Sequence, residues 1–134
     1  MENNIVRLFN KETDYTIVDG WWKAHGHHSA QPENLSDYGV ISFIGNKPVA
    51  ALWFYPILTA KFGLMMGPIS NPDTTKEERN EALNGCMKVI HMLARDLGYN
   101  TVLCLSNVKA FNKRLENFGY TEGDKDCSHY WGGL

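Results

Sequence analysis

One long amphipathic helix, set between two apolar segments, constrains this fold more than any other feature of the sequence. A capping box at Thr75 and Glu78, or at Thr74 and Glu77, marks its start. Gly98 predicts its end as a left-handed cap. Apolar residues recur between these limits at intervals of three and four, which predicts one buried face: Ala82, Cys86, Val89, Ile90, Leu93 and Leu97.

An apolar segment on each side of this helix completes a strand–helix–strand unit. The first, residues 62–70, contains Gly63, Gly67 and Pro68, which predict an irregular, bulged strand. The second, residues 101–105, is short and β-branched at its start, which predicts a buried strand in a parallel pair. The connection is long enough for a parallel crossover.

The remaining segments predict antiparallel strands and two further helices. Residues 4–9 form a strand candidate, and residues 10–25 form a helix that Gly26 ends. Residues 38–44 and 49–55 read as a hairpin around a turn rich in glycine and proline. A second amphipathic helix ends at Gly119, and one or two closing strands follow from Tyr120 to Trp131.

These elements predict a single α/β domain over residues 1–134, with helices on both faces of a mixed six- to seven-stranded sheet. No apolar run approaches the ~20 residues of a membrane helix, and the polar start of the chain is no signal peptide. Thirteen basic against fifteen acidic residues give a net charge of -2, which argues against nucleic-acid binding. We therefore expect a cytoplasmic protein with three buried, reduced cysteines and no metal site.

Three motifs stand in order along the chain. Ile69-Ser70-Asn71-Pro72 leaves a strand before the long helix, Gly98-Tyr99-Asn100 leads into residues 101–107, and Asn117-Phe118-Gly119-Tyr120 closes the last helix. In this order and spacing they resemble the GNAT family of N-acetyltransferases, in particular its compact bacterial and phage members. The resemblance covers nearly the whole chain and implies the GNAT fold.

The chain departs from the family pattern in three places. The family's glycine loop, Arg/Gln-x-x-Gly-x-Gly/Ala, has no glycine in the matching residues 74–83. The position of the family's tyrosine general acid falls on Leu115. No acidic residue lies between Phe62 and Ser70, where the family often has a base.

The resemblance implies acetyl-CoA as co-substrate. A helix start offers unpaired N–H groups and partial positive charge to a phosphate, although plain capping of a surface helix explains the same residues. Asn107 is either a ligand of the pantetheine amide or the cap of the next helix. Lys113 is either a phosphate contact or part of a solvated face. The full set expected to bind the cofactor is Ile69, Ser70, Asn71, Thr74, Thr75, Lys76, Asn107 and Lys113.

The expected catalytic groups are Ser70, His28 and His27. A backbone N–H near Ile69 or Ser70 can polarise the acetyl carbonyl. By resemblance, the loop after the first helix lines the acceptor pocket, so His28, with His27 next, is the candidate proton acceptor. His25 and the pair Trp21 and Trp22 are expected to contact the acceptor, with one indole in the core, while exposed loop histidines remain the simpler alternative.

The resemblance implies transfer of an acetyl group from acetyl-CoA to a primary amine by direct attack in a ternary complex. The acceptor is a small molecule or a protein, and a homodimer is possible. The alternative is a catalytically silent protein of the same fold that binds a partner through exposed aromatic residues, among them Tyr130 and Trp131.

Overall fold

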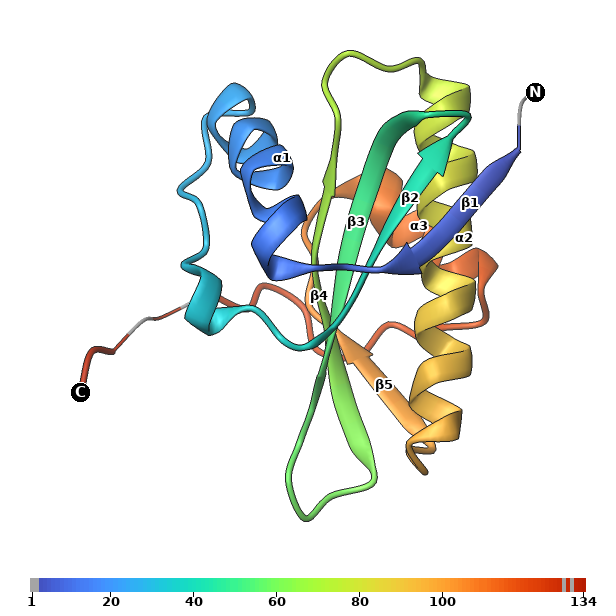
Figure 1. The fold of residues 1–134 in the computed structure, drawn as a ribbon. Coiled ribbons are helices and arrows are strands. Elements are labelled where there is room, and N and C mark those ends of the chain that lie inside the picture. Colours follow the sequence, from blue (N-terminus) through green and yellow to red (C-terminus); the bar gives the residue numbers. More distant parts are fainter. Residues whose placement is uncertain (1–2, 129, 131) are drawn as a thin grey trace.

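The structure, a computed structural model, describes residues 3–128, 130 and 132–134. Within these described residues, five strands and three α-helices follow one another in nearly the predicted order (Figure 1). They are β1 (Asn4–Leu8), α1 (Lys11–Ala24), the 3-10 turn η1 (Pro32–Asn34), β2 (Tyr38–Ile44), β3 (Lys47–Pro56), β4 (Phe62–Ser70), α2 (Lys76–Asp96), β5 (Thr101–Cys104) and α3 (Lys109–Asn117).

The strands form one mixed sheet in the order β1-β2-β3-β4-β5. The first four strands pair antiparallel, and β4 pairs with β5 in parallel. The predicted mixed sheet is therefore confirmed, but the predicted count of six to seven strands is wrong for the described residues. After Tyr120 the described residues form no strand, because residues 121–126 are rich in charge and glycine, which sheets disfavour. The predicted end of the last strand, at Trp131, lies outside the described residues.

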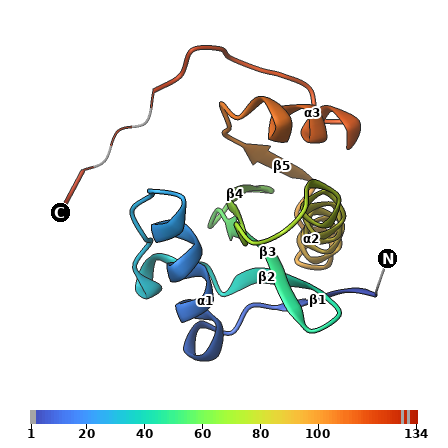
Figure 2. The ribbon, with the colours of Figure 1, turned by 90° about the horizontal axis from the view of Figure 1, so that it is seen from above.

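The helices cover both faces of the sheet, as predicted. Seen from above, α1 lies on one face, and α2 and α3 lie on the other (Figure 2). Because successive strand residues point to opposite faces, β3 supplies both cores. Trp53 packs beneath α1, and Phe54 packs beneath α2.

The long helix α2 begins and packs largely as its sequence predicts. Glu78 N–H donates to Thr75 Oγ1 (3.1 Å), and Thr75 N–H donates to the Glu78 carboxylate (2.9 Å), which completes the capping box. Ala82, Cys86 and Ile90 are fully buried, Val89 and Leu93 are half-buried, and Met87 and Ala94 complete the face. Leu97 is the exception, since it lies at the helix end and stays 41% exposed.

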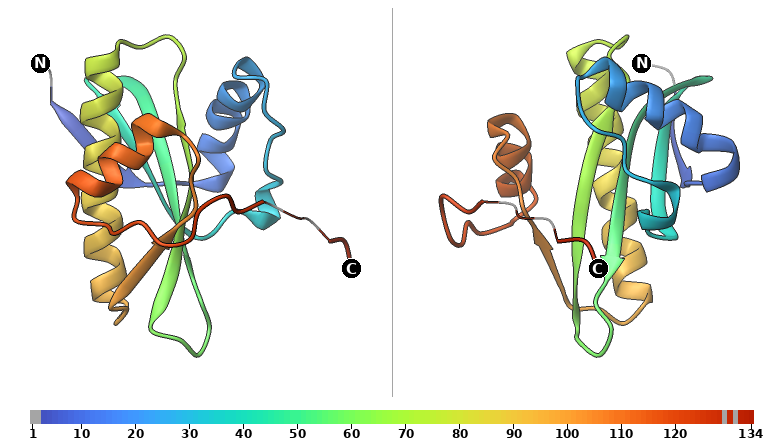
Figure 3. Two further views of the ribbon diagram at one scale, coloured as in Figure 1. Left: turned by 180° about the vertical axis from the view of Figure 1, so that it is seen from behind. Right: turned by 90° about the vertical axis from the view of Figure 1, so that its left-hand side faces the viewer.

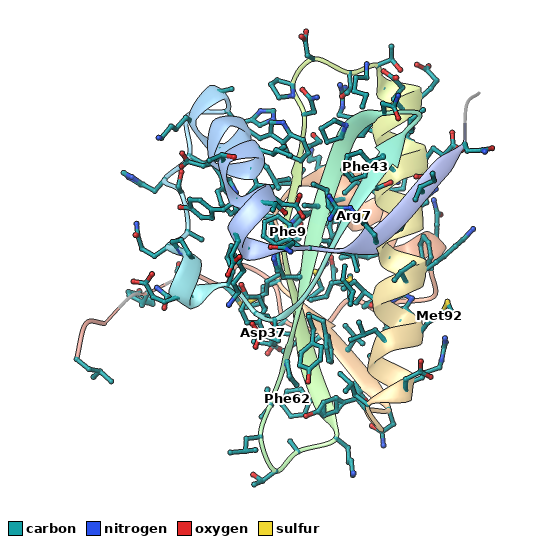
Figure 4. All side chains as sticks on the ribbon, in the orientation of Figure 1. Arg7, Phe9, Asp37, Phe43, Phe62 and Met92 are labelled. Atoms are coloured by element: carbon teal, nitrogen blue, oxygen red, sulfur yellow. The ribbon has the colours of Figure 1, made fainter. Side chains whose placement is uncertain are left out.

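A charged pair joins α1 to β1, the strand at one edge of the sheet. Arg7 on β1 donates two hydrogen bonds to the buried Asp14 carboxylate of α1, at 2.7 and 2.8 Å. The Arg7 guanidinium also lies 4.9 Å from the ring centre of Phe43 (Figure 4). This pair lowers the pKa of Asp14, opposed by burial.

No described helix is long and apolar enough to cross a membrane.

Candidate functional site

The parallel pair β4–β5 separates partway along its length. Backbone pairing runs from Phe62 with Thr101 to Met65 with Cys104 and ends there, while β4 continues beside β3 as far as Ser70. After β5 ends at Cys104, the chain leads away from β4 to α3 (Figure 3). Within the described part of the chain, residues 66–70 therefore have a strand neighbour on the β3 side only, and we call them the open β4 edge.

A bulge shapes this open edge. Trp53 pairs with Met66, but Ala51 pairs with Ile69, so β4 carries one extra residue between these pairs. Gly67 has φ +71, a left-handed conformation that glycine adopts without strain. The six-membered ring of Trp53 lies beneath it, so a Cβ built on Gly67 would be 3.4 Å from Cε3. The bulge predicted from glycine and proline is confirmed.

Beyond the bulge, the backbone of Ser70 faces away from β3. Asn71 N–H donates to Val49 O (2.7 Å), and backbone groups alternate in direction along an antiparallel ladder. Ile69 therefore bonds toward β3, while the N–H and C=O of Ser70 face the open edge. His25 Nε2, 2.9 Å from Ser70 O, is consistent with this orientation. Of the two residues considered from sequence, Ser70 is the one whose N–H is available there.

His25 reaches this edge from the C-terminal end of α1. His25 caps the helix, its N–H donates to Trp21 O (3.0 Å), and Gly26 with φ +77 turns the chain as predicted. His27 follows, with its ring stacked 6.1 Å from that of His25. Among the described residues, the exposed His28 side chain has no hydrogen-bond partner.

Trp21 and Trp22 both lie in the core, so the expectation that one of them faces outward is wrong. They are 6% and 8% exposed. Trp22 stacks on Trp53 with ring centres 5.7 Å apart, and Leu35 from the segment after α1 belongs to the same cluster. The last turn of α1 is therefore covered both by the sheet, through Trp53, and by the segment that follows the helix, through Leu35. Both indoles are buried in one core cluster with Trp53 of β3 and Ile69 of β4.

The start of α2 is partly occupied by its own loop. The capping box uses the N–H groups of Thr75 and Glu78, which leaves those of Lys76 and Glu77 without a partner among the described residues. Thr74 Oγ1 donates to Asn71 O (2.5 Å). Two adjacent N–H groups and the exposed Lys76 are therefore available to an anion.

Two neighbouring groups at this helix start have structural partners. Asn71 Nδ2 donates to Pro48 O (2.9 Å), and Asn71 Oδ1 accepts from Asp73 N–H (2.9 Å), so its side chain holds the turn. The Glu78 carboxylate accepts from Thr75 N–H, which lowers its pKa, and pairs with Lys47 at 3.3 Å. That pairing offsets one of the two negative charges in the first helical turn.

The residues after β5 exclude one of the two roles expected for Asn107. Val108 is the cap residue of α3 and its N–H donates to Ser106 Oγ (3.2 Å), so Asn107 is not the helix cap. Asn107 and Lys113 are exposed. Arg114, by contrast, packs on α2 and donates to Asn84 Oδ1 (2.7 Å), and burial lowers its pKa.

One polar pair was missed at the sequence level because no spacing links its members. His91 Nε2 on α2 lies 2.6 Å from Tyr120 Oη, just beyond α3. Burial, with a smaller contribution from Cys104, raises the pKa of Tyr120 to about 12. Burial likewise lowers the pKa of His91. The contact holds the segment after α3 against α2.

The three cysteines are free thiols, and they differ in burial. Burial raises the pKa of Cys86 to about 12 and that of Cys104 to about 11. Cys104 is half-buried and Cys127 is exposed, so the expectation that all three are buried is wrong for these two. No group of three or more His, Cys, Asp or Glu side chains among the described residues is arranged to hold a metal ion.

Comparison with known proteins supports the fold through structure alone. No protein-family model matches the chain, and no curated protein matches it in sequence. N-acetylglutamate synthase from Neisseria gonorrhoeae, solved with coenzyme A and N-acetyl-glutamate, matches with TM-score 0.65 and 15% identity over 85% of this chain. This chain spans only 28% of that synthase.

Two full-length matches extend the comparison. Aminoglycoside N-acetyltransferase AAC(6')-Iy, solved with CoA, matches with TM-score 0.67 and 13% identity over 98% of this chain and 96% of its own. A transcriptional regulator from Bacillus halodurans matches with TM-score 0.67 and 10% identity over 96% of this chain and 100% of its own. The chain thus has the GNAT acyl-CoA N-acyltransferase fold that its motifs implied.

Proposed function

We propose that this protein is an acetyl-CoA-dependent N-acetyltransferase that acts on a primary amine. The observation that carries the proposal is the open β4 edge, where a glycine bulge and the parting of β5 leave the Ser70 N–H without a strand partner. An acyl carbonyl can accept a hydrogen bond from such a group. Proteins of this fold solved with coenzyme A, such as the synthase and the aminoglycoside enzyme, support the choice of donor.

The described residues fit the donor in two places. Along residues 66–70, free backbone groups can pair with the pantetheine amides as an added strand would. At the start of α2, the N–H groups of Lys76 and Glu77 and the Lys76 ammonium suit a pyrophosphate. Asn107 and Lys113 are the candidates for further contacts from the β5 side. The acetyl thioester, when bound, supplies the electrophilic carbon.

The protein's part in the reaction is positioning, polarisation and proton transfer. Ser70 N–H stabilises the negative charge that develops on the carbonyl oxygen. A histidine of the segment after α1 accepts a proton from the acceptor ammonium, whose pKa, if lysine-like, is about 10.4. Direct attack in a ternary complex requires no nucleophile from the protein, which agrees with the raised pKa of Cys86 and Cys104.

The test is acetyl transfer to a panel of primary amines that includes amino acids, polyamines, aminoglycosides and a lysine peptide. Release of free thiol above the rate of thioester hydrolysis, with an amide product confirmed by mass, supports the proposal. Binding of acetyl-CoA without transfer to any of these amines counts against it.

A silent binding protein of this fold is the second candidate. The glycine-free loop, the two carboxylates in the first turn of α2, and the buried Leu115 at the tyrosine position favour it. The regulator from Bacillus halodurans has a similar fold. Absence of acetyl-CoA binding together with absence of transfer would favour this candidate.

A further inference from the structure

Among the described residues, His25 makes the one side-chain hydrogen bond to the open β4 edge. Its Nε2 lies 2.9 Å from the carbonyl oxygen of Ser70, although the two residues are 45 positions apart. Three backbone hydrogen bonds hold its position: His25 N–H to Trp21 O, Gly26 N–H to Lys23 O and His27 N–H to Trp22 O, at 3.0, 3.1 and 2.8 Å. The ring is therefore fixed at the edge from both its backbone and its tip.

This contact fixes where the proton of the imidazole resides. A carbonyl oxygen only accepts, so Nε2 carries the hydrogen and donates it. In the neutral ring, the lone pair is then on Nδ1. A hydrogen bond from one ring nitrogen thus leaves the other as a proton acceptor, in the same way that bound carbonyls set the tautomer of other functional histidines.

We infer that His25, rather than His28, accepts the proton of the attacking amine through Nδ1, while its Nε2–H holds the Ser70 carbonyl. The inference rests on the proposed acetyl transfer. N–H and C=O of one strand residue share an edge, so the ring bound to the Ser70 carbonyl lies beside the Ser70 N–H assigned to the oxyanion. Among the described residues, the His28 side chain makes no hydrogen bond to this edge.

The transfer then balances as follows. Nδ1 takes one proton from the acceptor ammonium, and the freed amine nitrogen forms a bond to the thioester carbonyl carbon. The carbonyl π electrons move to the oxygen, against Ser70 N–H. When they return, the C–S bond breaks, the thiolate leaves with the electron pair, and the second amine proton passes to it. The products are an amide and the CoA thiol, and His25 releases its proton to solvent.

The described groups that face the His25 ring are few. From α1 and its loop, the His27 ring stacks on it at 6.1 Å, and from β4 it meets the uncharged Ser70 carbonyl. Lys23 and Asp19 on α1 pair with each other at 2.9 Å. The pH dependence of turnover should therefore follow the two adjacent imidazoles, and in particular the one bonded to Ser70.

The decisive variant is His25→Gln, because its side-chain amide still donates to Ser70 O but has no titratable lone pair. We expect it to melt like the wild type, to bind acetyl-CoA with unchanged affinity, and to lose at least ~100-fold in kcat together with the rising limb of the pH profile. His28→Gln provides the comparison, since the loss falls on that variant if His28 is the base. A wild-type rate in His25→Gln overturns the inference and leaves the proposed function standing.

A second measurement needs no acceptor. A long-range proton–nitrogen NMR spectrum of the wild type, above the imidazole titration, should show a protonated Nε2 and an unprotonated Nδ1 for His25. The opposite tautomer overturns the inference whatever the rates show. Absence of acetyl transfer by the wild type, by contrast, overturns the proposed function and the proton-accepting role together.

Discussion

Replacing Gly67 by alanine tests whether the bulge on β4 both strains the backbone and forms the binding site. At φ +71 an L-residue costs about 1–2 kcal/mol relative to a right-handed conformation. The substitution regains about 0.4–1 kcal/mol by restricting the unfolded chain. The added Cβ meets Trp53 Cε3 at 3.4 Å, an ordinary contact. The free energy of unfolding should therefore fall by roughly 1 kcal/mol, or about 3–5 °C in Tm for a chain of this length.

Gly98→Ala is the matched control, because Gly98 has φ +88 and open space around its Cβ position. Both variants should lose similar stability in urea or thermal unfolding. Only Gly67→Ala should weaken acetyl-CoA binding, by about tenfold or more in calorimetry, since that site alone directs the backbone of the open β4 edge. Wild-type stability in Gly67→Ala would refute the strain reasoning, and equal acetyl-CoA affinity in both variants would refute the placement of the site.

Three further predictions concern stability. Gly85→Ala should lower the free energy of unfolding in urea by about 1–2 kcal/mol, because the added Cβ would lie 2.6 Å from the hydrogen-bonded amide of Asn4. Gly20→Ala, with open space around its Cβ position in α1, should raise the free energy of unfolding by up to ~1 kcal/mol. Equal effects of the two substitutions would contradict the packing. Asp14→Asn should lower stability at pH 7 by about 1–3 kcal/mol. Because the folded pKa of Asp14 is depressed, its contribution to stability is present above the unfolded pKa near 3.9 and is lost as the pH falls through the folded value. The stability of the variant should therefore fall less steeply than that of the wild type below about pH 4. A parallel loss of stability in the two proteins would contradict this. Ile90→Ala should cost about 2–5 kcal/mol because the side chain is fully buried, and a loss below ~1 kcal/mol would show that α2 does not pack as described.

Local chemistry made much of the fold predictable from the sequence. The capping box of Thr75 and the left-handed glycines at the ends of three helices act within a few residues, so their sequence signals carry over directly. The bulge on β4 follows from glycine and proline in the same way. These signals predicted the order of the elements and the bulge on β4.

Properties set by distant neighbours were harder to predict. Leu103 is 46% exposed although its strand is apolar, because among the described residues β5 has a strand partner on one edge only. Trp21 and Trp22 point in different directions, but the chain after α1 also contributes to the core around them. The bond from His25 to Ser70 depends on how α1 lies on the sheet, which no spacing in the sequence encodes.

The most direct test of the central claim is a titration of the isotope-labelled protein with acetyl-CoA, followed by amide proton–nitrogen NMR. The account predicts saturable chemical-shift changes of the Ser70, Lys76 and Glu77 amides. It also predicts that acetyl-CoA at 100 times its Kd raises the free energy of unfolding by about 2.7 kcal/mol, seen as a higher Tm. Unchanged spectra at millimolar acetyl-CoA, or shifts confined to residues away from the open β4 edge and the start of α2, would contradict it.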